Sequence, residues 1–264
     1  MTPLHAVVLG IVQGATEFLP VSSSGHLILV PRLLGWPDQG LAFDAAVHLG
    51  TVLALLIYFA EELRRLAVGV LEGEPADRRL ALGIVLGSIP AGVVGLAFQH
   101  VIEERLRSVT VVAMSTILWA VVLWWADRRA AGNRVGGLRE VGVGRALVVG
   151  LAQPLSLIPG TSRSGITLSA GLFAGLDRPT AARFAFLLGL PITLAAGLLQ
   201  ARTLIVAPPA GEGPGVILLG IVTSFVAGLA AIRFLVAYLQ RRTLLVFVIY
   251  RIVLGVLLLA LVRG

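Results

Sequence analysis

Six apolar segments, each about as long as a helix that crosses a bilayer, recur along the chain. They lie at 41–60, 80–98, 108–126, 183–201, 214–238 and 244–262. In hydrocarbon a spanning segment must satisfy its own backbone hydrogen bonds, and uninterrupted apolar runs of this length are typical of helices. The composition agrees, with 57% hydrophobic and 13% charged residues. We therefore expect an all-α polytopic membrane protein.

Two further pairs of apolar segments are too short to cross a membrane alone. The first pair is 4–19 and 27–34, and the second is 143–158 and 164–176. Pro20 and Gly25 interrupt the first pair, and Pro159 with Gly160 splits the second, because both residue types break helices. Each pair is predicted to be a re-entrant hairpin. The expected fold class is thus six transmembrane helices plus two re-entrant helical hairpins.

The two halves of the chain resemble each other. Gly10, Gln13, Ser24 and Gly25 match Gly150, Gln153, Ser164 and Gly165 at a constant offset of 140 residues. Each half then contains one hairpin followed by three spans, with repeat 1 at about 1–126 and repeat 2 at about 143–264. We expect one membrane domain over residues 1–264 and no separate soluble domain.

Arginine supplies every basic side chain, and its distribution predicts the topology. Thirteen of the 21 arginines fall in the segments 61–79, 127–145, 177–183 and 239–243, and five fall in the connections on the other side. Because cytoplasmic loops are enriched in basic residues, the first set is placed in the cytoplasm. Both termini and the first hairpin then face outward and the second hairpin faces inward. This is an inverted-topology repeat of the transporter type.

The net charge of +7 favours contact with anionic lipid over nucleic-acid binding, because the arginines are scattered over short loops. The chain has no cysteine, which excludes disulfides and thiolate metal sites. The start lacks a basic n-region, so no removable signal peptide is expected. Short polar loops are predicted at 61–79, 99–107, 127–145, 202–213 and 240–243.

Polar side chains gather at the first helix break. Gln13, Glu17, Ser22, Ser23, Ser24 and His26 lie within 14 positions, between apolar runs. Ionisable groups at membrane depth are costly and tend to be functional. Three roles are open for Glu17: a general base, a metal ligand or the counter-ion of Arg163. Gln13 lies one helical turn earlier on the same face and can position water or a metal.

The serines and the histidine each have a structural and a chemical interpretation. Ser22, Ser23 or Ser24 can simply cap the second helix of the hairpin. A hydroxyl close to Glu17 and an arginine would instead suit nucleophilic attack on phosphorus. His26 can protonate a leaving group, form a phosphohistidine or be structural.

The second break, P-G-T-S-R-S-G at Pro159–Gly165, has residue types that bind phosphate. Arg163 offers a planar fork of donors. Gly160 and Gly165 let backbone N–H groups approach an anion, and a helix is predicted to start directly after the break. The alternative is a structural arginine that reaches the membrane interface. The inverted topology would bring this stretch close to the first break.

Four other polar residues have weaker signals. Asp44 and His48, at i and i+4 near the start of a span, can bind one metal or lie at the interface. Arg233 and Arg251 are expected to extend towards the inner membrane surface, and no chemistry is assigned to them.

These motifs resemble the undecaprenyl-pyrophosphate phosphatase family, also called the bacitracin-resistance family. The anchors are L-G-I-V-Q-G-A-T-E-F-L-P-V-S-S-S-G-H-L (Leu9–Leu27), F-D-A-A-V-H-L-G-T (Phe43–Thr51), P-G-T-S-R-S-G (Pro159–Gly165) and F-A-F-L-L-G-L-P (Phe184–Pro191). The similarity covers the length of the chain, and the first and third motifs together are its specific part.

The resemblance implies a bacterial inner-membrane hydrolase that faces the periplasm. It would remove the terminal phosphate of undecaprenyl pyrophosphate, regenerate the carrier lipid for peptidoglycan synthesis and confer bacitracin resistance. The implied catalytic residues are Glu17, Ser22, His26 and Arg163, with Ser22 as the nucleophile. Substrate binding is expected at Gln13, Ser23, Ser24, Gly25, Gly160, Thr161, Ser162, Ser164 and Gly165.

The resemblance also implies a divalent cation, Mg²⁺ or Ca²⁺. This chain has Gln13 where many family members have Glu, so we expect Mg²⁺ to bridge Glu17 and the pyrophosphate rather than to be held by protein alone. The expected partners are the polyprenyl pyrophosphate lipid and membrane lipids, without nucleic acid; a homodimer is left open.

Two other classes of protein share part of this pattern. A polyprenyl-phosphate carrier or flippase is consistent with an inverted repeat of broken helices. A carrier needs only to bind its ligand, whereas a base, a hydroxyl, an imidazole and an arginine at one place are the groups of a reaction. This argues against pure transport. A structural scaffold would not explain polar residues at both breaks.

Overall fold

The computed structural model describes residues 1–37, 39–106, 108–133, 135–206 and 213–263, and nearly all of them are helical. The α-helices are α1 (Pro3–Phe18), α2 (Ser23–Leu34), α3 (Gly40–Tyr58), α4 (Ala60–Glu72), α5 (Pro75–Arg105), α6 (Val109–Arg129), α7 (Val143–Ala152), α8 (Arg163–Phe173), α9 (Arg178–Val206), α10 (Pro214–Leu239) and α11 (Leu245–Arg263). Short 3-10 helices are η1 (Ala130–Gly132), η2 (Leu138–Glu140) and η3 (Gln153–Leu157). The expected all-α class is confirmed.

Long apolar helices account for most of the predicted spans. Four are long and apolar enough to cross a membrane: Pro75–Phe98, Val109–Gly132, Arg178–Leu199 and Pro214–Leu239. A fifth is obtained if α3 and α4 are taken as one span bent by 59°. The segment predicted at 244–262 forms a shorter apolar helix, Leu245–Ala260. Within the described residues, length and composition therefore give four or five spans of the six expected.

Two predicted loops are helical instead. α4 fills much of the predicted loop 61–79, because its sequence is amphipathic: Leu63 and Leu66 pack against the core while Arg64 and Arg65 are exposed. α5 continues to Arg105, through most of the predicted loop at 99–107. Of the predicted connector at 202–213, residues 207–212 lie outside the described part of the chain, and α9 extends to Val206.

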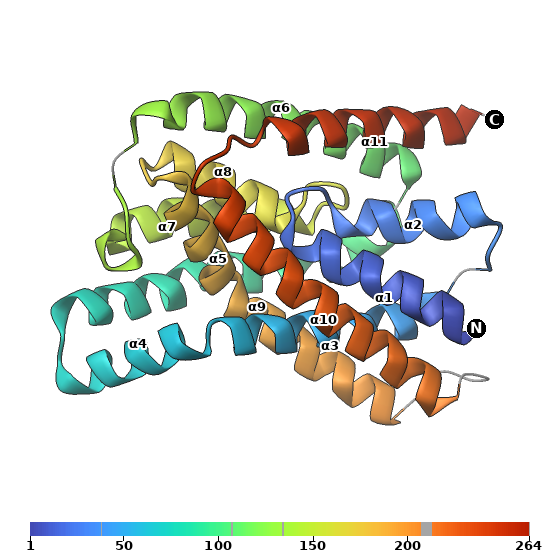
Figure 1. Cartoon of the computed structure of the whole chain (residues 1–264), viewed down its shortest axis with the longest axis horizontal. Helices are drawn as coiled ribbons and strands as arrows, with labels where there is room; N and C mark the ends of the chain where they lie inside the picture. The colour runs from blue at the N-terminus through green and yellow to red at the C-terminus, as the bar shows by residue number, and fades with distance from the viewer. Residues whose placement is uncertain (38, 107, 134, 207–212, 264) are drawn as a thin grey trace.

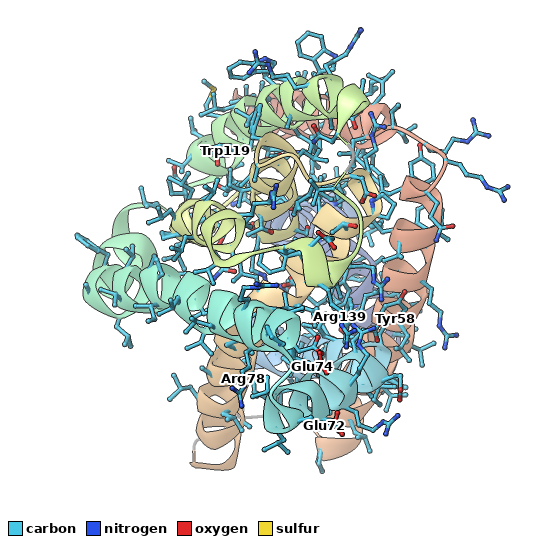
Figure 2. The ribbon with its side chains drawn as sticks, turned by 90° about the vertical axis from the view of Figure 1, so that its left-hand side faces the viewer. Tyr58, Glu72, Glu74, Arg78, Trp119 and Arg139 are labelled. Atoms are coloured by element: carbon cyan, nitrogen blue, oxygen red, sulfur yellow. The ribbon has the colours of Figure 1, made fainter. Side chains whose placement is uncertain are left out.

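The two chain termini and two of the arginine-rich connections lie at opposite ends of the molecule (Figure 1). Figure 1 shows the N and C termini at one end of the molecule and the α4–α5 turn with the α6–α7 connection at the other. Several arginines of that second end form ion pairs. Arg139 donates to both oxygens of the buried Asp77, at 3.0 and 2.7 Å, and Figure 2 shows Arg139 close to the turn that carries Glu72 and Glu74. Arg178 likewise donates to Asp127, at 2.5 Å.

The two helix breaks share one local geometry. α1 ends at Phe18 and α2 begins at Ser23; α7 continues into η3, which ends at Leu157, and α8 begins at Arg163. Each new helix is preceded by a serine with positive φ, 72° at Ser22 and 69° at Ser162. Among the described residues other than glycine, these are the ones with positive φ. Strained backbone of this kind tends to occur at functional sites, which directs attention to the breaks.

The helices pack in matched pairs. In the first half of the chain, α1 and α3 both lie against α10 of the second half. In the second half, α7 and α9 both lie against α5 of the first. In addition, α3 contacts α9 and α6 contacts α11. Ser224 of α10 donates to the Val47 carbonyl at 2.7 Å, and Ser88 of α5 donates to the Leu188 carbonyl at 3.2 Å. The two halves of the chain thus make equivalent contacts with each other.

Glycine permits the closest of these approaches. A Cβ atom at Gly150 in α7 would lie 2.4 Å from the backbone of Gly87 in α5, and one at Gly14 in α1 would lie 2.3 Å from the Ser224 carbonyl in α10. Backbone contact at these points draws the first helix of each hairpin against the opposite half. The two breaks are consequently held at the interface between the halves.

Candidate active site

Glu17 and Arg163 form an ion pair across the two helix breaks. Glu17 is in the last turn of α1 and Arg163 opens α8, 146 positions further on, yet Arg163 Nη2 donates to Glu17 Oε1 at 2.6 Å. Their side chains are 10% and 22% exposed. Both residues were singled out from the sequence, and the structure brings them together.

The second oxygen of Glu17 accepts two more hydrogen bonds. Ser23 Oγ donates to Glu17 Oε2 at 2.9 Å, and Gln13 Nε2 donates to it at 3.1 Å. The carboxylate is therefore positioned by three donors, one of which is a hydroxyl. A carboxylate that accepts a hydrogen bond from a serine is placed to receive its proton when the serine attacks an electrophile.

Arg163 is held on its other side by α9. Its Nη1 donates to Thr193 Oγ1, which in turn donates to the Gly189 carbonyl at 2.6 Å. The Arg163 guanidinium packs beside Gly189, where a Cβ would make an ordinary van der Waals contact, 3.6 Å from Nε. The cavity beside Glu17 and Arg163 measures about 10 Å³, which is room for roughly one water.

Three of the predicted substrate-binding residues, Ser24, Gly160 and Ser164, make hydrogen bonds that join the two helix breaks. Ser24 Oγ accepts from the Gly160 N–H at 3.2 Å, and Ser164 Oγ donates to the Leu19 carbonyl at 3.1 Å. Ser162 Oγ accepts from the Gly165 N–H at 3.2 Å and caps α8. These contacts fix the position of Arg163, the first residue of α8, relative to the end of α1.

The remaining predicted residues of the second break are packed tightly. Gly160 has φ of 91°, and a Cβ there would lie 2.2 Å from the Val112 carbonyl of α6. Thr161 is fully buried, with its Oγ1 3.0 Å from Ser115 Oγ. The break therefore follows the surface of α6 closely.

Ser22 and His26 lie apart from the Glu17 carboxylate. His26 Nδ1 lies 2.8 Å from the Ser22 carbonyl, and Nε2 lies 2.6 Å from Tyr250 Oη. Because a carbonyl only accepts, Nδ1 carries the hydrogen and Nε2 accepts from the tyrosine in the neutral ring. Ser22 Oγ bonds Ser24 Oγ at 3.2 Å, and Gly25 packs against Leu254. In this arrangement Ser23, and not Ser22, has its hydroxyl on the carboxylate.

Three residues near these groups received no role from the sequence: Thr193, Tyr250 and Arg251. The expectation for Arg251 was wrong. Its side chain is 0% exposed and does not extend to the membrane surface, because it bonds carbonyls at both helix breaks. The available signal was a lone arginine in the middle of the apolar segment 244–262.

His48 is the imidazole nearest to Glu17. Its Nδ1 lies 2.7 Å from the Asp44 carbonyl, so Nε2 is directed towards Glu17 Oε2, 3.8 Å away. The side-chain amide of Gln13 also bonds Glu17, and its oxygen, Oε1, is buried and has no hydrogen-bond partner among the described residues. The described part of the chain contains no cluster of three or more His, Asp or Glu side chains that could hold a metal. Glu17, His48 and Gln13 therefore suit a cation that takes most of its ligands elsewhere.

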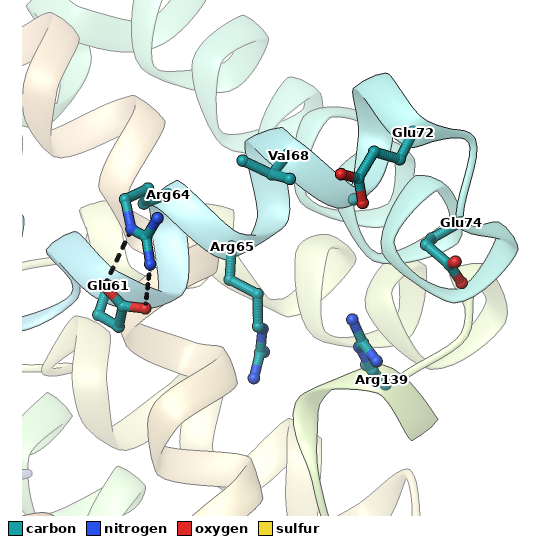
Figure 3. A pocket seen from close by; sticks show the side chains of 8 residues that line it. Glu61, Arg64, Arg65, Val68, Glu72, Glu74 and Arg139 are labelled. Atoms are coloured by element: carbon teal, nitrogen blue, oxygen red, sulfur yellow. Dashed lines mark hydrogen bonds and ion pairs between the residues drawn. The ribbon is translucent and has the colours of Figure 1, made fainter.

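A surface hollow of about 310 Å³ lies apart from these residues. It is found between α4 and η2 and is lined by Glu61, Arg64, Arg65, Val68, Gly69, Glu72, Glu74 and Arg139. Within this hollow Arg64 is hydrogen-bonded to Glu61 (Figure 3), and Arg139 is hydrogen-bonded to Asp77. Its charges largely compensate one another, so we assign it no chemistry.

The fold and the paired breaks define a class: a helical membrane protein with an arginine–carboxylate–serine site shared between two broken helices. The sequence profile of the family "Bacitracin resistance protein BacA" matches residues 6–257, and the chain belongs to this family. It is 48% identical to an undecaprenyl-diphosphatase of Chromohalobacter salexigens, with 97% of each chain covered. It is 46% identical to undecaprenyl-diphosphatase 2 of Stutzerimonas stutzeri, with 100% of each covered. The resemblance seen in the motifs is confirmed.

Proposed function

We propose that this protein hydrolyses undecaprenyl diphosphate to undecaprenyl phosphate and inorganic phosphate. The family and the names of its relatives support this activity. The observation that carries it is the 2.6 Å contact of Arg163 with Glu17, because it unites a phosphate-binding cation with the carboxylate that holds a serine. Regeneration of the carrier lipid for peptidoglycan synthesis and resistance to bacitracin follow from this reaction.

The proposed architecture has six transmembrane helices, with α3 and α4 as one bent span and α11 as the last, and two re-entrant hairpins. The matched break geometry and matched helix contacts support an inverted repeat of about 1–126 and 143–264. The arginine distribution supports a bacterial inner membrane with the first hairpin open to the periplasm. Glu17 and the serines of the first break would then face the periplasmic side.

In the proposed reaction Arg163 exchanges its bond with Glu17 for oxygens of the diphosphate. The positive N-terminal end of α8 adds to the attraction for the anion. Ser23 Oγ attacks the terminal phosphorus and passes its proton to Glu17; the anhydride bond breaks, and undecaprenyl phosphate leaves with that proton. Glu17 then deprotonates a water that attacks the phosphoserine, the Oγ–P bond breaks, inorganic phosphate leaves and Ser23 Oγ takes the proton back from Glu17. The geometry favours Ser23 over Ser22, the nucleophile expected from the resemblance; Ser22 and His26 are proposed to support the break.

The direct test is phosphate release by the purified protein in detergent. Undecaprenyl diphosphate should yield one inorganic phosphate for each undecaprenyl phosphate, since one anhydride bond is broken. A lipid carrier would release none, so a pure, folded preparation without phosphate release would contradict the proposal and favour transport.

A divalent cation, Mg²⁺ or Ca²⁺, is proposed to bind between Glu17 and the diphosphate. Glu17 Oε2, His48 Nε2 and the unpartnered Gln13 Oε1 would hold it, and it would supply neutralisation of phosphate charge. Phosphate and water would complete the coordination, as Mg²⁺ prefers.

Removal of the His48 imidazole should weaken this cation site. With Mn²⁺ as the probe and a non-hydrolysable diphosphate present, electron spin-echo spectra should show coupling to a histidine nitrogen in the wild type. His48→Gln should lose that coupling and bind Mn²⁺ roughly tenfold more weakly. His5→Gln serves as the control, because His5 stacks on Trp36 at the other end of α1. Retained nitrogen coupling in His48→Gln would remove His48 from the site.

A further inference from the structure

Arg251 is a fully buried arginine whose partners are all backbone carbonyls. In the middle of α11 its side chain is 0% exposed. Nε donates to Thr116 O at 3.2 Å, Nη1 to Pro20 O at 3.4 Å, and Nη2 to Gly160 O at 3.0 Å and Thr161 O at 2.9 Å. None of its hydrogen bonds in the described residues goes to a carboxylate.

The carbonyls that Arg251 binds belong to the two helix breaks. Pro20 follows the end of α1, and Gly160 and Thr161 follow the end of η3. These three carbonyls lie beyond the helix ends, in the non-helical links, where no helix N–H of the described residues is available to them. A buried carbonyl without a hydrogen-bond donor is costly, and a cation placed between the two links supplies donors to both. The planar fork of a guanidinium can bond several carbonyls in fixed directions, which an ammonium cannot do.

These carbonyls are close in sequence to the reacting groups. Pro20 lies midway between Glu17 and Ser23, and Thr161 lies two residues before Arg163. Gly165 leaves room for the guanidinium, because a Cβ there would lie 2.9 Å from Arg251 Nη1. We propose that Arg251 is a positioning residue that sets the distance between the two helix breaks and thereby aligns Ser23 and Glu17 with Arg163.

The surrounding helices make this contact rigid. Thr116 Oγ1 of α6 donates to Gly160 O at 3.2 Å, so the same carbonyl is held from α6 and from α11. Tyr250, the neighbour of Arg251, bonds His26 of the first hairpin at 2.6 Å. Consecutive residues of α11 thus fix α2 and both breaks against the α6–α11 pair.

The inference rests on the proposed diphosphatase activity and makes a separate prediction about it. Arg163 would still attract the diphosphate if Arg251 were changed, but the serine and the phosphorus would be misaligned. Misplacement of reacting groups by about 1 Å can cost roughly a hundredfold in rate. The loss should therefore be seen in kcat, with KM changed by less than about threefold.

The test compares Arg251→Lys and Arg251→Gln with Arg233→Gln, an exposed arginine of α10. Each protein is checked for folding by gel filtration and thermal melting in detergent, and kcat and KM are measured per folded protein. Arg251→Lys, which keeps the charge and most of the packing, should lose roughly tenfold or more in kcat. Arg251→Gln should lose more, and Arg233→Gln should match the wild type.

Two results would overturn the inference while leaving the activity intact. One is a folded Arg251→Lys protein with kcat within twofold of the wild type. The other is an Arg251→Lys protein that does not fold, because the residue would then serve global stability rather than the register of the breaks. An inactive wild type in the same assay would count against the proposed function instead.

Discussion

Arg163→Ala should lower phosphate release by at least roughly a thousandfold, the scale seen when an arginine that stabilises a transferring phosphoryl group is removed. The guanidinium bonds Glu17 on one side and Thr193 on the other, so it is held at the point where the two helix breaks meet. Its loss removes the charge that would hold the diphosphate and leaves Glu17 without its cation.

Arg163→Lys should be nearly as damaging. Lysine keeps the charge but cannot bond Glu17 and Thr193 together with the fork geometry that the site uses. Arg233→Ala is the matched control, since Arg233 is exposed and lies on α10. Initial rates at saturating and limiting substrate provide the measurement. Full phosphate release by folded Arg163→Ala would remove the arginine from the reaction.

Ser23→Ala should lower kcat by roughly a thousandfold or more, as expected when a nucleophile that works with an adjacent base is removed. The reason is the 2.9 Å hydrogen bond from Ser23 Oγ to Glu17 Oε2. Ser22→Ala should stay within about tenfold of the wild type, because Ser22 Oγ bonds Ser24 and not the carboxylate.

The two serine variants form their own control, because they are neighbours in one break. Acid quenching of the wild type during turnover, followed by mass spectrometry, should place a phosphate on Ser23. The opposite order of effects, with Ser22→Ala inactive and Ser23→Ala active, would assign the nucleophile to Ser22. Similar activity of both variants would favour attack by water.

Only the first of the two helix breaks carries a carboxylate. At the offset of 140 residues, Leu157 occupies the place of Glu17. Gln153, the counterpart of Gln13, is buried, and neither its side-chain nitrogen nor its oxygen has a partner among the described residues. The second break has a positive φ at its serine, like the first, and supplies Arg163, while the carboxylate lies in the first. In the proposed site the two breaks therefore contribute different groups.

The fold was largely predictable because its elements have strong local signals. Apolar runs of helical length predicted α5, α6, α9 and α10, and the prolines with glycines predicted the breaks. The error at α4 has the same origin: its charged residues suggest a loop, but their helical spacing places leucines on the core face. Hydropathy alone does not separate a polar loop from an amphipathic helix.

The contact between Glu17 and Arg163 could be anticipated because an acid and an arginine interrupt apolar sequence at the two breaks. Their action on a substrate is proposed. The choice between Ser22 and Ser23 depends on the backbone at Ser22, whose φ of 72° no pattern reveals. The direction of His26 is set by Tyr250, 224 positions away, and the burial of Arg251 is set by carbonyls from three segments.

The most direct test of the account is a double-mutant cycle on Glu17→Gln and Arg163→Gln, with kcat/KM as the observable. If the two residues act as one unit on the diphosphate, the double variant should be scarcely less active than the worse single variant. If the two losses multiply, the hairpins contribute independently, and the claim that two helix breaks form one active site is contradicted.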